Sequence, residues 1–204
     1  MIICIGREFG SGGREIGKKL AEQLNVPFYD KELIEIAAKE SGLDKELFEE
    51  EDSRTSKGFR LLGALGYSLG GPLSTITELS LNDRLFLVQS QVIEQVAKEG
   101  ACVIVGRCAD YALSDNPDCI NIFIHADLDV RIKNVSRNLN ITENKARDII
   151  NKTDKQRASY YNYYTSKKWG DSKSYNLSLD AGKLGTDNCV EMILKFRELM
   201  DAMK

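Results

Sequence analysis

The sequence contains few of the residues on which several large classes of protein depend. His125 is the single histidine among 204 residues, so a histidine-rich zinc site and a Cys-His triad are both excluded. Only 3 prolines are present, and no run reaches the roughly 18 apolar residues that a membrane helix requires. With 42% hydrophobic and 29% charged residues, the chain is expected to form one soluble globular domain.

An excess of basic charge is absent too. The 28 lysines and arginines are outnumbered by 31 aspartates and glutamates, and the net charge of −3 argues against a nucleic-acid partner. The five cysteines include no C-x-x-C pair, so we expect reduced and mostly buried thiols. The first residues form no basic leader or cleavage site, which predicts a cytoplasmic protein without a membrane partner.

Short apolar runs alternate with amphipathic segments along most of the chain. Three continuous apolar runs have the pattern of strands buried on both faces, at 2–6, 101–105 and 120–124. Weaker strand candidates are VPFYD and YNLSLD, at 26–30 and 175–180. Amphipathic helices are expected at 14–24, 81–100, 127–139, 142–164 and 188–203. This alternation predicts a three-layer α/β fold, in which helices flank a parallel sheet of about five strands.

Residues 41–83 break the alternation. They run from a charged stretch into one rich in Gly, Ser and Leu, without a clean period, and we interpret them as an inserted, mobile helical subdomain. The acid run 49–52 is expected to be a solvated helix face. The apolar stretch LLGALGYSLGGPL could cover an acceptor or form a contact in a homodimer.

A glycine-rich turn, GREFGSGGREIG, joins the first strand to the first helix at residues 6–17. Glycines permit a tight turn whose backbone N–H groups approach an anion, and the helix N-terminus adds the positive end of its dipole. This position, at the carboxyl end of a strand, is where open α/β sheets bind ligands. We therefore predict a phosphate-binding turn that includes Gly10, Ser11, Gly12 and Gly13. The standard pattern G-x-x-x-x-G-K-[ST] is not satisfied.

A dinucleotide-binding alternative must be weighed against this prediction. Gly6, Gly10 and Gly12 match the G-x-x-x-G-x-G turn of short-chain dehydrogenases, and Tyr163-x-x-x-Lys167 or Tyr164-x-x-x-Lys168 mimics their catalytic pair. NAD or NADP would then be the ligand. The chain is short for that family and lacks the serine expected upstream of the tyrosine, so the reductase remains the weaker reading.

Three segments together resemble the cytidylate kinase-like family of P-loop proteins: GREFGSGGREIGKKLAEQLNVPFYDKELI, FLVQSQVIEQVAKEGACVIVGRCADYAL and NIFIHADLDVRIKNV. The most specific pieces are REFGSGGREI, VIVGRCADY and KQRASYYNYY. The resemblance spans nearly the whole chain. It implies a P-loop core with a monophosphate-binding insertion, for which 41–83 is the matching segment, and a lid at 142–172. It also implies Mg²⁺, ATP as the phosphoryl donor, and a nucleotide such as CMP or dCMP as the acceptor.

The chain departs from that family in the turn itself. Superposing the helix registers places the Walker lysine on Gly13 and the magnesium-binding hydroxyl near Glu15. Arg14, or Arg7 across the turn, could supply the missing cation, because a guanidinium binds phosphate as a bidentate fork. Ser11 or Glu15 could approach the magnesium ion. A nucleotide-binding protein without transfer activity is therefore a second alternative.

The resemblance and the strand ends assign the remaining roles. Arg107 follows Gly106 at the end of the third strand and is expected to hold the acceptor phosphate, while Asp110 would orient Arg107, contact the nucleotide or cap a helix. Asp30 ends the second strand, where it would serve the metal or the acceptor, or cap the next helix. Arg157 would close from the lid. The predicted catalytic residues are thus Arg14, Arg107 and Arg157.

Other conspicuous side chains receive no chemistry. Arg131 and Arg137 are expected to be exposed on their helix, and His125 to be a packing or capping residue. Trp169 and the nearby tyrosines recur at helical spacing, which favours a place in the core over base stacking. Sequence leaves open the preferred base and the oligomeric state.

Overall fold

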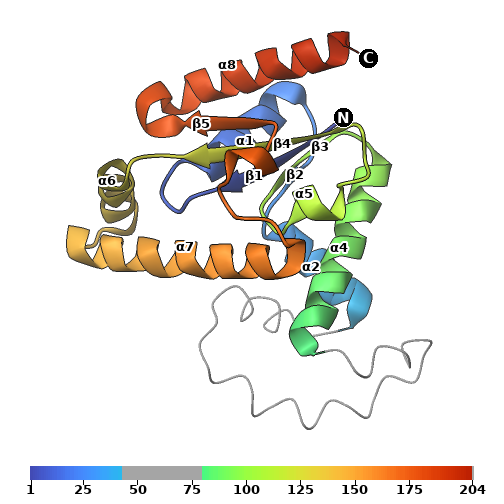
Figure 1. Cartoon of the computed structure of the whole chain (residues 1–204), viewed down its shortest axis with the longest axis horizontal. Helices are drawn as coiled ribbons and strands as arrows, with labels where there is room; N and C mark the ends of the chain where they lie inside the picture. The colour runs from blue at the N-terminus through green and yellow to red at the C-terminus, as the bar shows by residue number, and fades with distance from the viewer. Residues whose placement is uncertain (43–79, 204) are drawn as a thin grey trace.

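The computed structural model describes residues 1–42 and 80–203 (Figure 1). A five-stranded, all-parallel sheet forms its centre, in the order β2-β3-β1-β4-β5. Its strands are β1 (Ile2–Arg7), β2 (Phe28–Tyr29), β3 (Cys102–Val105), β4 (Cys119–His125) and β5 (Leu177–Asp180). The predicted α/β fold is confirmed, including both weaker strand candidates.

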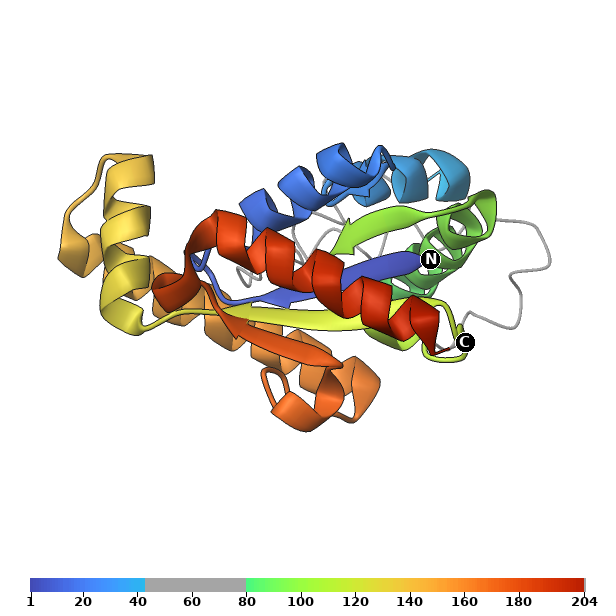
Figure 2. The same cartoon turned by 90° about the horizontal axis from the view of Figure 1, so that it is seen from above.

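Helices flank this sheet on both faces. They are α1 (Gly13–Leu24), α2 (Glu32–Ser41), α4 (Leu81–Glu99), α5 (Ala109–Ala112), α6 (Leu128–Leu139), α7 (Glu143–Thr165) and α8 (Ala181–Ala202), with a short 3-10 helix, η3 (Ser172–Ser174). Figure 2 shows α8 running over the sheet and α6 lying beyond its end. In Figure 1, α7 lies on the side of the sheet opposite α8.

Two apolar layers hold the helices to the sheet. Successive side chains of β1 point to opposite faces, so Ile2 and Cys4 pack with α2, α4 and α5, whereas Ile3 and Ile5 pack with α1 and α8. Fully burying an aliphatic side chain of this size contributes about 1.5–3 kcal/mol. The apolar runs of β1 and β3 are therefore explained by helices on both faces of these strands.

The strand register brings three turns to one edge of the sheet. Ile5 is paired with Val105 in β3, and Arg7 is paired with Ile124 in β4. Because all strands are parallel, the residues that follow β1, β2 and β3 leave the sheet on the same side. The glycine-rich turn, Asp30 and Arg107 are thus neighbours, although up to a hundred residues separate them in the chain.

The two segments expected outside the core differ in how much of them is described. Residues 43–79 lie outside the described part of the chain, and with them the predicted subdomain, its acid run and its apolar stretch. The segment 142–172 contains α7, whose N-cap Thr142 accepts a hydrogen bond from the backbone N–H of Lys145 at 3.4 Å. No helix in the described ranges is both long and apolar enough to cross a membrane.

The last helix begins earlier than its apolar pattern predicts. It starts at Ala181 because the Asp180 carboxylate accepts the N–H groups of Gly182 and Lys183 at 3.0 and 3.2 Å, capping a first turn. Gly185, with φ 77°, then interrupts the helical backbone. The turn before this break contributes only Ala181 and Leu184 to the core, too few residues to show a helical period in the sequence.

Candidate functional site

The glycine-rich turn uses two left-handed glycines to reach the start of α1. Gly10 has φ 81° and Gly12 has φ 89°, and α1 begins at the next residue. A Cβ on Gly10 would lie 2.7 Å from Cγ2 of Val135 in α6. Both the left-handed backbone conformation and the close approach of α6 therefore require glycine at position 10.

Ser11 links the glycine-rich turn to the end of β4. Its buried hydroxyl donates to the backbone oxygen of Glu8 at 2.9 Å and lies 3.2 Å from that of Ile124 at the end of β4. Glu15, in the first turn of α1, is exposed and lies 3.4 Å from Nζ of Lys19. The magnesium roles of Ser11 and Glu15 stay predictions, because neither side chain is placed with a second metal-ligating group.

Within residues 1–42 and 80–203, no three His, Cys, Asp or Glu side chains gather as a metal site. The described side chains therefore do not fit a magnesium site built by the protein alone. Mg²⁺ in phosphoryl-transfer sites is commonly held by one or two carboxylates, substrate phosphates and water.

Asp30 is buried where β2 ends and is shared by two arginines. The Nε atom of Arg14 donates to its Oδ2 at 2.7 Å, and Nη2 of Arg7 lies 3.6 Å from its Oδ1. Arg14 reaches this carboxylate across the Phe28 ring and remains 57% exposed. The helix-capping alternative for Asp30 is wrong, because the N-cap of α2 is Lys31.

A cavity of about 310 Å³ opens between the carboxyl ends of β1 and β3 and the inner side of α7. It lies at the lower limit of typical small-molecule sites. Among the residues that the structure describes, five cationic side chains line it: Arg7, Arg107, Lys152, Lys155 and Arg157. Asp110, Tyr160, Tyr161, Trp169 and Tyr175 form much of the remaining wall. The structure thus brings together the predicted residues Arg107, Asp110 and Arg157, whereas Arg14 and Asp30 are not part of this lining.

The backbone conformation of the residues after β3 places Arg107 at the cavity. Gly106, Arg107 and Cys108 follow β3 with φ values of 79°, 61° and 52°. Left-handed conformations of non-glycine residues cost on the order of 1–3 kcal/mol and concentrate at functional sites. The strand therefore ends in three consecutive left-handed residues, and α5 begins immediately after them.

Asp110 is held by a residue that sequence reasoning did not connect to it. Asp110 is only 8% exposed, and its carboxylate accepts a hydrogen bond from the Tyr161 hydroxyl of α7 at 2.6 Å. Burial raises the pKa of Asp110, while the Tyr161 hydrogen bond opposes that shift. Burial likewise raises the pKa of the Tyr161 phenol. This bond joins the β3 side of the cavity to α7.

Replacing Tyr161 with phenylalanine is expected to destabilise the protein in a pH-dependent way. The raised folded-state pKa of Asp110 means that stability falls as the pH rises from its unfolded value through its folded value. Without the Tyr161 hydroxyl the folded-state pKa rises further, so we expect little loss near pH 4 and a loss of about 1–3 kcal/mol near pH 7. Urea unfolding at both pH values measures it.

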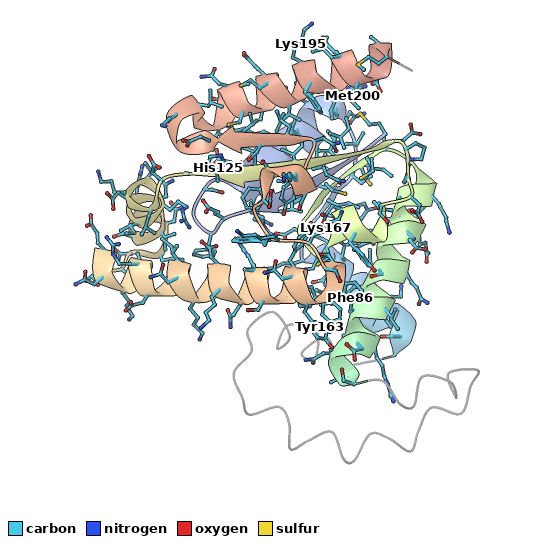
Figure 3. All side chains as sticks on the ribbon, viewed as in Figure 1. Phe86, His125, Tyr163, Lys167, Lys195 and Met200 are labelled. Carbon is cyan, nitrogen blue, oxygen red and sulfur yellow. The ribbon has the colours of Figure 1, made fainter. Side chains whose placement is uncertain are left out.

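The matched control for that change is Tyr163→Phe, which alters a tyrosine of the same helix that is 70% exposed. Figure 3 labels Tyr163 on the side of α7 turned away from the sheet. Equal effects of the two variants at both pH values would contradict a stabilising Tyr161–Asp110 bond.

Two side chains of α7 bind the glycine-rich turn directly. Nη1 of Arg157 donates to the backbone oxygen of Arg7 at 3.1 Å, and its guanidinium lies 5.5 Å from the centre of the Phe9 ring. Asp154 accepts the backbone N–H of Phe9 at 2.8 Å. The helix predicted as a lid is therefore in contact with the turn that it would cover.

Arg131 is a correction to the sequence prediction. Expected on the surface of α6, it is buried: its Nε donates to the backbone oxygen of Ala126 at 2.9 Å, and its Nη1 to Asp154 at 2.5 Å. The Oε2 atom of Glu8 lies 3.3 Å from the Nε atom of Arg131. Arg131 falls on the same helix face as Leu128 and Val135, a signal that could have indicated burial. Arg137 is exposed as predicted.

Aromatic residues dock the other end of α7. Tyr164 stacks on Phe86 of α4, with ring centres 4.0 Å apart and an interplanar angle of 6°. Figure 3 shows Phe86 at this junction of α4 and α7. Trp169 meets Phe123 edge-on at 5.3 Å. The predicted core position is thus confirmed in part: Tyr161 is buried and Trp169 is half-buried in this cluster, whereas Tyr163 is 70% exposed. Trp169 also lines the cavity.

Comparisons with known proteins found a matching family and similar solved structures. A model described as the cytidylate kinase-like family matches residues 2–183. A solved structure of an uncharacterized protein from Eubacterium ventriosum ATCC 27560 is 34% identical, with a TM-score of 0.73, covering 97% of this chain and 98% of that one. No curated protein matches.

Two shikimate kinases share the fold at lower identity. The enzyme from Bacteroides thetaiotaomicron is 16% identical, with a TM-score of 0.54, over 97% of this chain and 98% of that one. The enzyme from Acinetobacter baumannii, solved in complex with shikimate, is 14% identical, with a TM-score of 0.52, over 100% and 94%. The family match overturns the dehydrogenase alternative, and Tyr163 lies outside the cavity lining.

Proposed function

Because the chain belongs to the cytidylate kinase-like family, we propose that it is a phosphotransferase that moves the γ-phosphoryl group of ATP to a nucleotide such as CMP or dCMP. The observation that supports this most directly is the cavity beside the glycine-rich turn, lined by five cations. Phosphoryl transfer demands chiefly that two anionic substrates be positioned and their charge neutralised.

The donor would bind at the glycine-rich turn. Left-handed Gly10 and Gly12 shape the backbone here, and α1 contributes the positive end of its dipole at residue 13. Backbone N–H groups of residues 10–14 would hold the donor phosphates. Magnesium is expected to arrive as the ATP complex, and we assign no catalytic step to it.

The acceptor would occupy the cavity. Arg107, carried to the cavity at the end of β3, would hold the acceptor phosphate as a bidentate fork. Asp110 offers a buried carboxylate on the same wall. A volume of about 310 Å³ suits one small substrate and excludes much of the solvent.

A lid role for α7 is supported by its contacts. Arg157 lines the cavity and reaches the turn through its bond to the backbone oxygen of Arg7. Closing such a helix over bound triphosphate removes water from the reacting groups and adds a cation beside the transferred phosphoryl group. No covalent intermediate on the protein is required.

One observation favours a second candidate, a nucleotide-binding protein without transfer activity. Asp154 accepts the Phe9 N–H, so a carboxylate of the chain itself occupies one donor of the turn. The position of the Walker lysine is also a glycine. Such a protein would bind ATP without consuming it.

The test is ADP release by the full chain with ATP and Mg²⁺, across CMP, dCMP, UMP, AMP, GMP, shikimate and no acceptor. We expect release above the acceptor-free rate with a pyrimidine monophosphate. Shikimate is included because two solved proteins of this fold are shikimate kinases. Tight ATP binding with no acceptor-dependent release would favour the second candidate, and absence of ATP binding would contradict both.

A further inference from the structure

Gly13 occupies the position at which a phosphate-binding lysine is expected. Gly12 directly precedes α1 and Gly13 opens it, which places them on the Gly-Lys pair of the G-x-x-x-x-G-K-[ST] pattern. The left-handed glycines of the chain include Gly10 and Gly12 but not Gly13. Its backbone would accept any L residue, and glycine is disfavoured in a helix, so the reason for glycine here must be space.

The side chain of Arg7 fills that space. A Cβ on Gly13 would lie 2.5 Å from Cβ of Arg7 and 3.1 Å from its Cγ. Non-bonded carbon atoms approach to about 3.5–4.0 Å at their optimum, so side chains at both positions would overlap. An arginine at position 7 and a lysine at position 13 therefore exclude each other, and both would begin at nearly the same point beside the turn.

From this origin Arg7 crosses the ends of the neighbouring strands. Its Nη1 atom fills the place that a Cβ on Gly106 would take at the end of β3. Its Nη2 lies 3.6 Å from the Asp30 carboxylate that follows β2. The side chain is 18% exposed and lines the cavity together with Arg107 and Arg157. The guanidinium thus reaches the cavity from the strand side of the turn.

We propose that Arg7 is the phosphate-binding cation of this site and replaces the missing lysine from the strand that precedes the turn. The inference rests on the proposed function. A guanidinium at this point stays charged and binds phosphate oxygens in a fork, where lysine would act as a point charge. Gly13 and Gly106 are then the two residues whose lack of a side chain makes room for it.

Arg14, the other candidate, has a different role in this arrangement. It is 57% exposed, does not belong to the cavity lining, and binds Asp30 through Nε at 2.7 Å. Asp30 in turn lies beside Arg7. Arg14 is accordingly a positioning residue that balances the charge of Asp30, and Arg7 is the residue that faces the ligand.

The experiment exchanges the two side chains in the full chain. Four variants are compared with wild type: Arg7→Gln, the double variant Arg7→Gly with Gly13→Lys, Gly13→Lys alone, and Arg14→Gln. Glycine is needed at position 7 because the overlap begins at its Cβ. The readouts are ATP affinity, ADP release with the best acceptor, and the melting temperature without ligand.

We expect Arg7→Gln, which keeps the Cβ and removes the guanidinium and its charge, to lower turnover about a thousandfold, the scale of a transition-state arginine. Gly13→Lys alone should lower the melting temperature through the overlap. The exchanged double variant should recover at least tenfold over Arg7→Gln, because a cation again starts beside the turn. Arg14→Gln should weaken turnover less than Arg7→Gln.

Wild-type turnover in Arg7→Gln, or a folded double variant no more active than Arg7→Gln, would overturn the role of Arg7 while leaving the kinase proposal intact. A larger loss in Arg14→Gln than in Arg7→Gln would also overturn it. If the wild-type chain itself neither binds nor consumes ATP, the proposed function fails, and the role of Arg7 fails with it.

Discussion

Replacing Arg157 with alanine is expected to reduce the turnover number about a thousandfold while the protein stays folded. Arg157 lines the cavity, donates to the backbone oxygen of Arg7 and covers the Phe9 ring, so its cation lies beside both the turn and the acceptor space. An arginine that meets the transferred phosphoryl group chiefly in the transition state affects kcat more than KM. Steady-state kinetics with the acceptor found in the screen measures both constants.

Arg147→Ala supplies the matched control for this experiment. It removes an arginine of the same helix whose side chain is 49% exposed and lies 3.7 Å from Asp129, away from the cavity lining. Its kinetics should match those of wild type. A loss of activity in Arg157→Ala no greater than in Arg147→Ala would contradict the assignment of Arg157 to the reacting phosphates.

The sheet and its helices were predictable because each rests on a local pattern. The run at 120–124 is apolar except at Asn121, because α8 and α1 cover Ile120, Ile122 and Ile124 on one face of β4, and Phe123 is buried on the opposite face. The start of α7 was predictable from Thr142, a capping residue before an acidic first turn. Such signals depend on residues within one turn or one strand, and sequence displays them directly.

Contacts across the chain were less accessible to sequence reasoning. The hydrogen bond between Asp110 and Tyr161 joins residues 51 positions apart, and the sequence around one residue does not indicate its partner. The steric overlap between the Arg7 side chain and any side chain at position 13 is of the same kind. It depends on the shape of the glycine-rich turn, which the number of glycines in the sequence does not reveal. Sequence therefore named Arg107 and Arg157, which the structure brings to one cavity lining, and the preference that we propose for Arg7 over Arg14 depends on the fold.

Arg131 illustrates how a charged residue can be misplaced by composition alone. A cation on an amphipathic helix is usually solvated, and that expectation held for Arg137. Arg131 is buried because two acids from distant segments, Glu8 and Asp154, lie against it, and because a backbone carbonyl accepts its Nε. Burial of an arginine requires such partners, and only the folded chain supplies them.

Replacing Arg131 with methionine is expected to lower the free energy of unfolding by up to about 3–5 kcal/mol, since it leaves the partly buried acids Glu8 and Asp154 without their cation. The glycine-rich turn should be destabilised as well, because Asp154 binds both Arg131 and the backbone N–H of Phe9. The double variant Arg131→Met with Asp154→Asn should lose less than the sum of the single losses, because it removes the uncompensated charge. Urea unfolding of the three variants measures these differences.

Arg137→Met is the control for the loss of an arginine from α6, and its unfolding free energy should stay within about 0.5 kcal/mol of wild type, as for most surface changes. The same variants separate stability from binding, because the network holds the turn through the backbone of Phe9. If the network orders the turn, ATP affinity should fall in Arg131→Met even at temperatures where the variant is fully folded. Unfolding free energies and ATP affinities equal to those of Arg137→Met would mean that α6 and α7 do not depend on this ion pair and that the turn is held by its glycines and by Ser11.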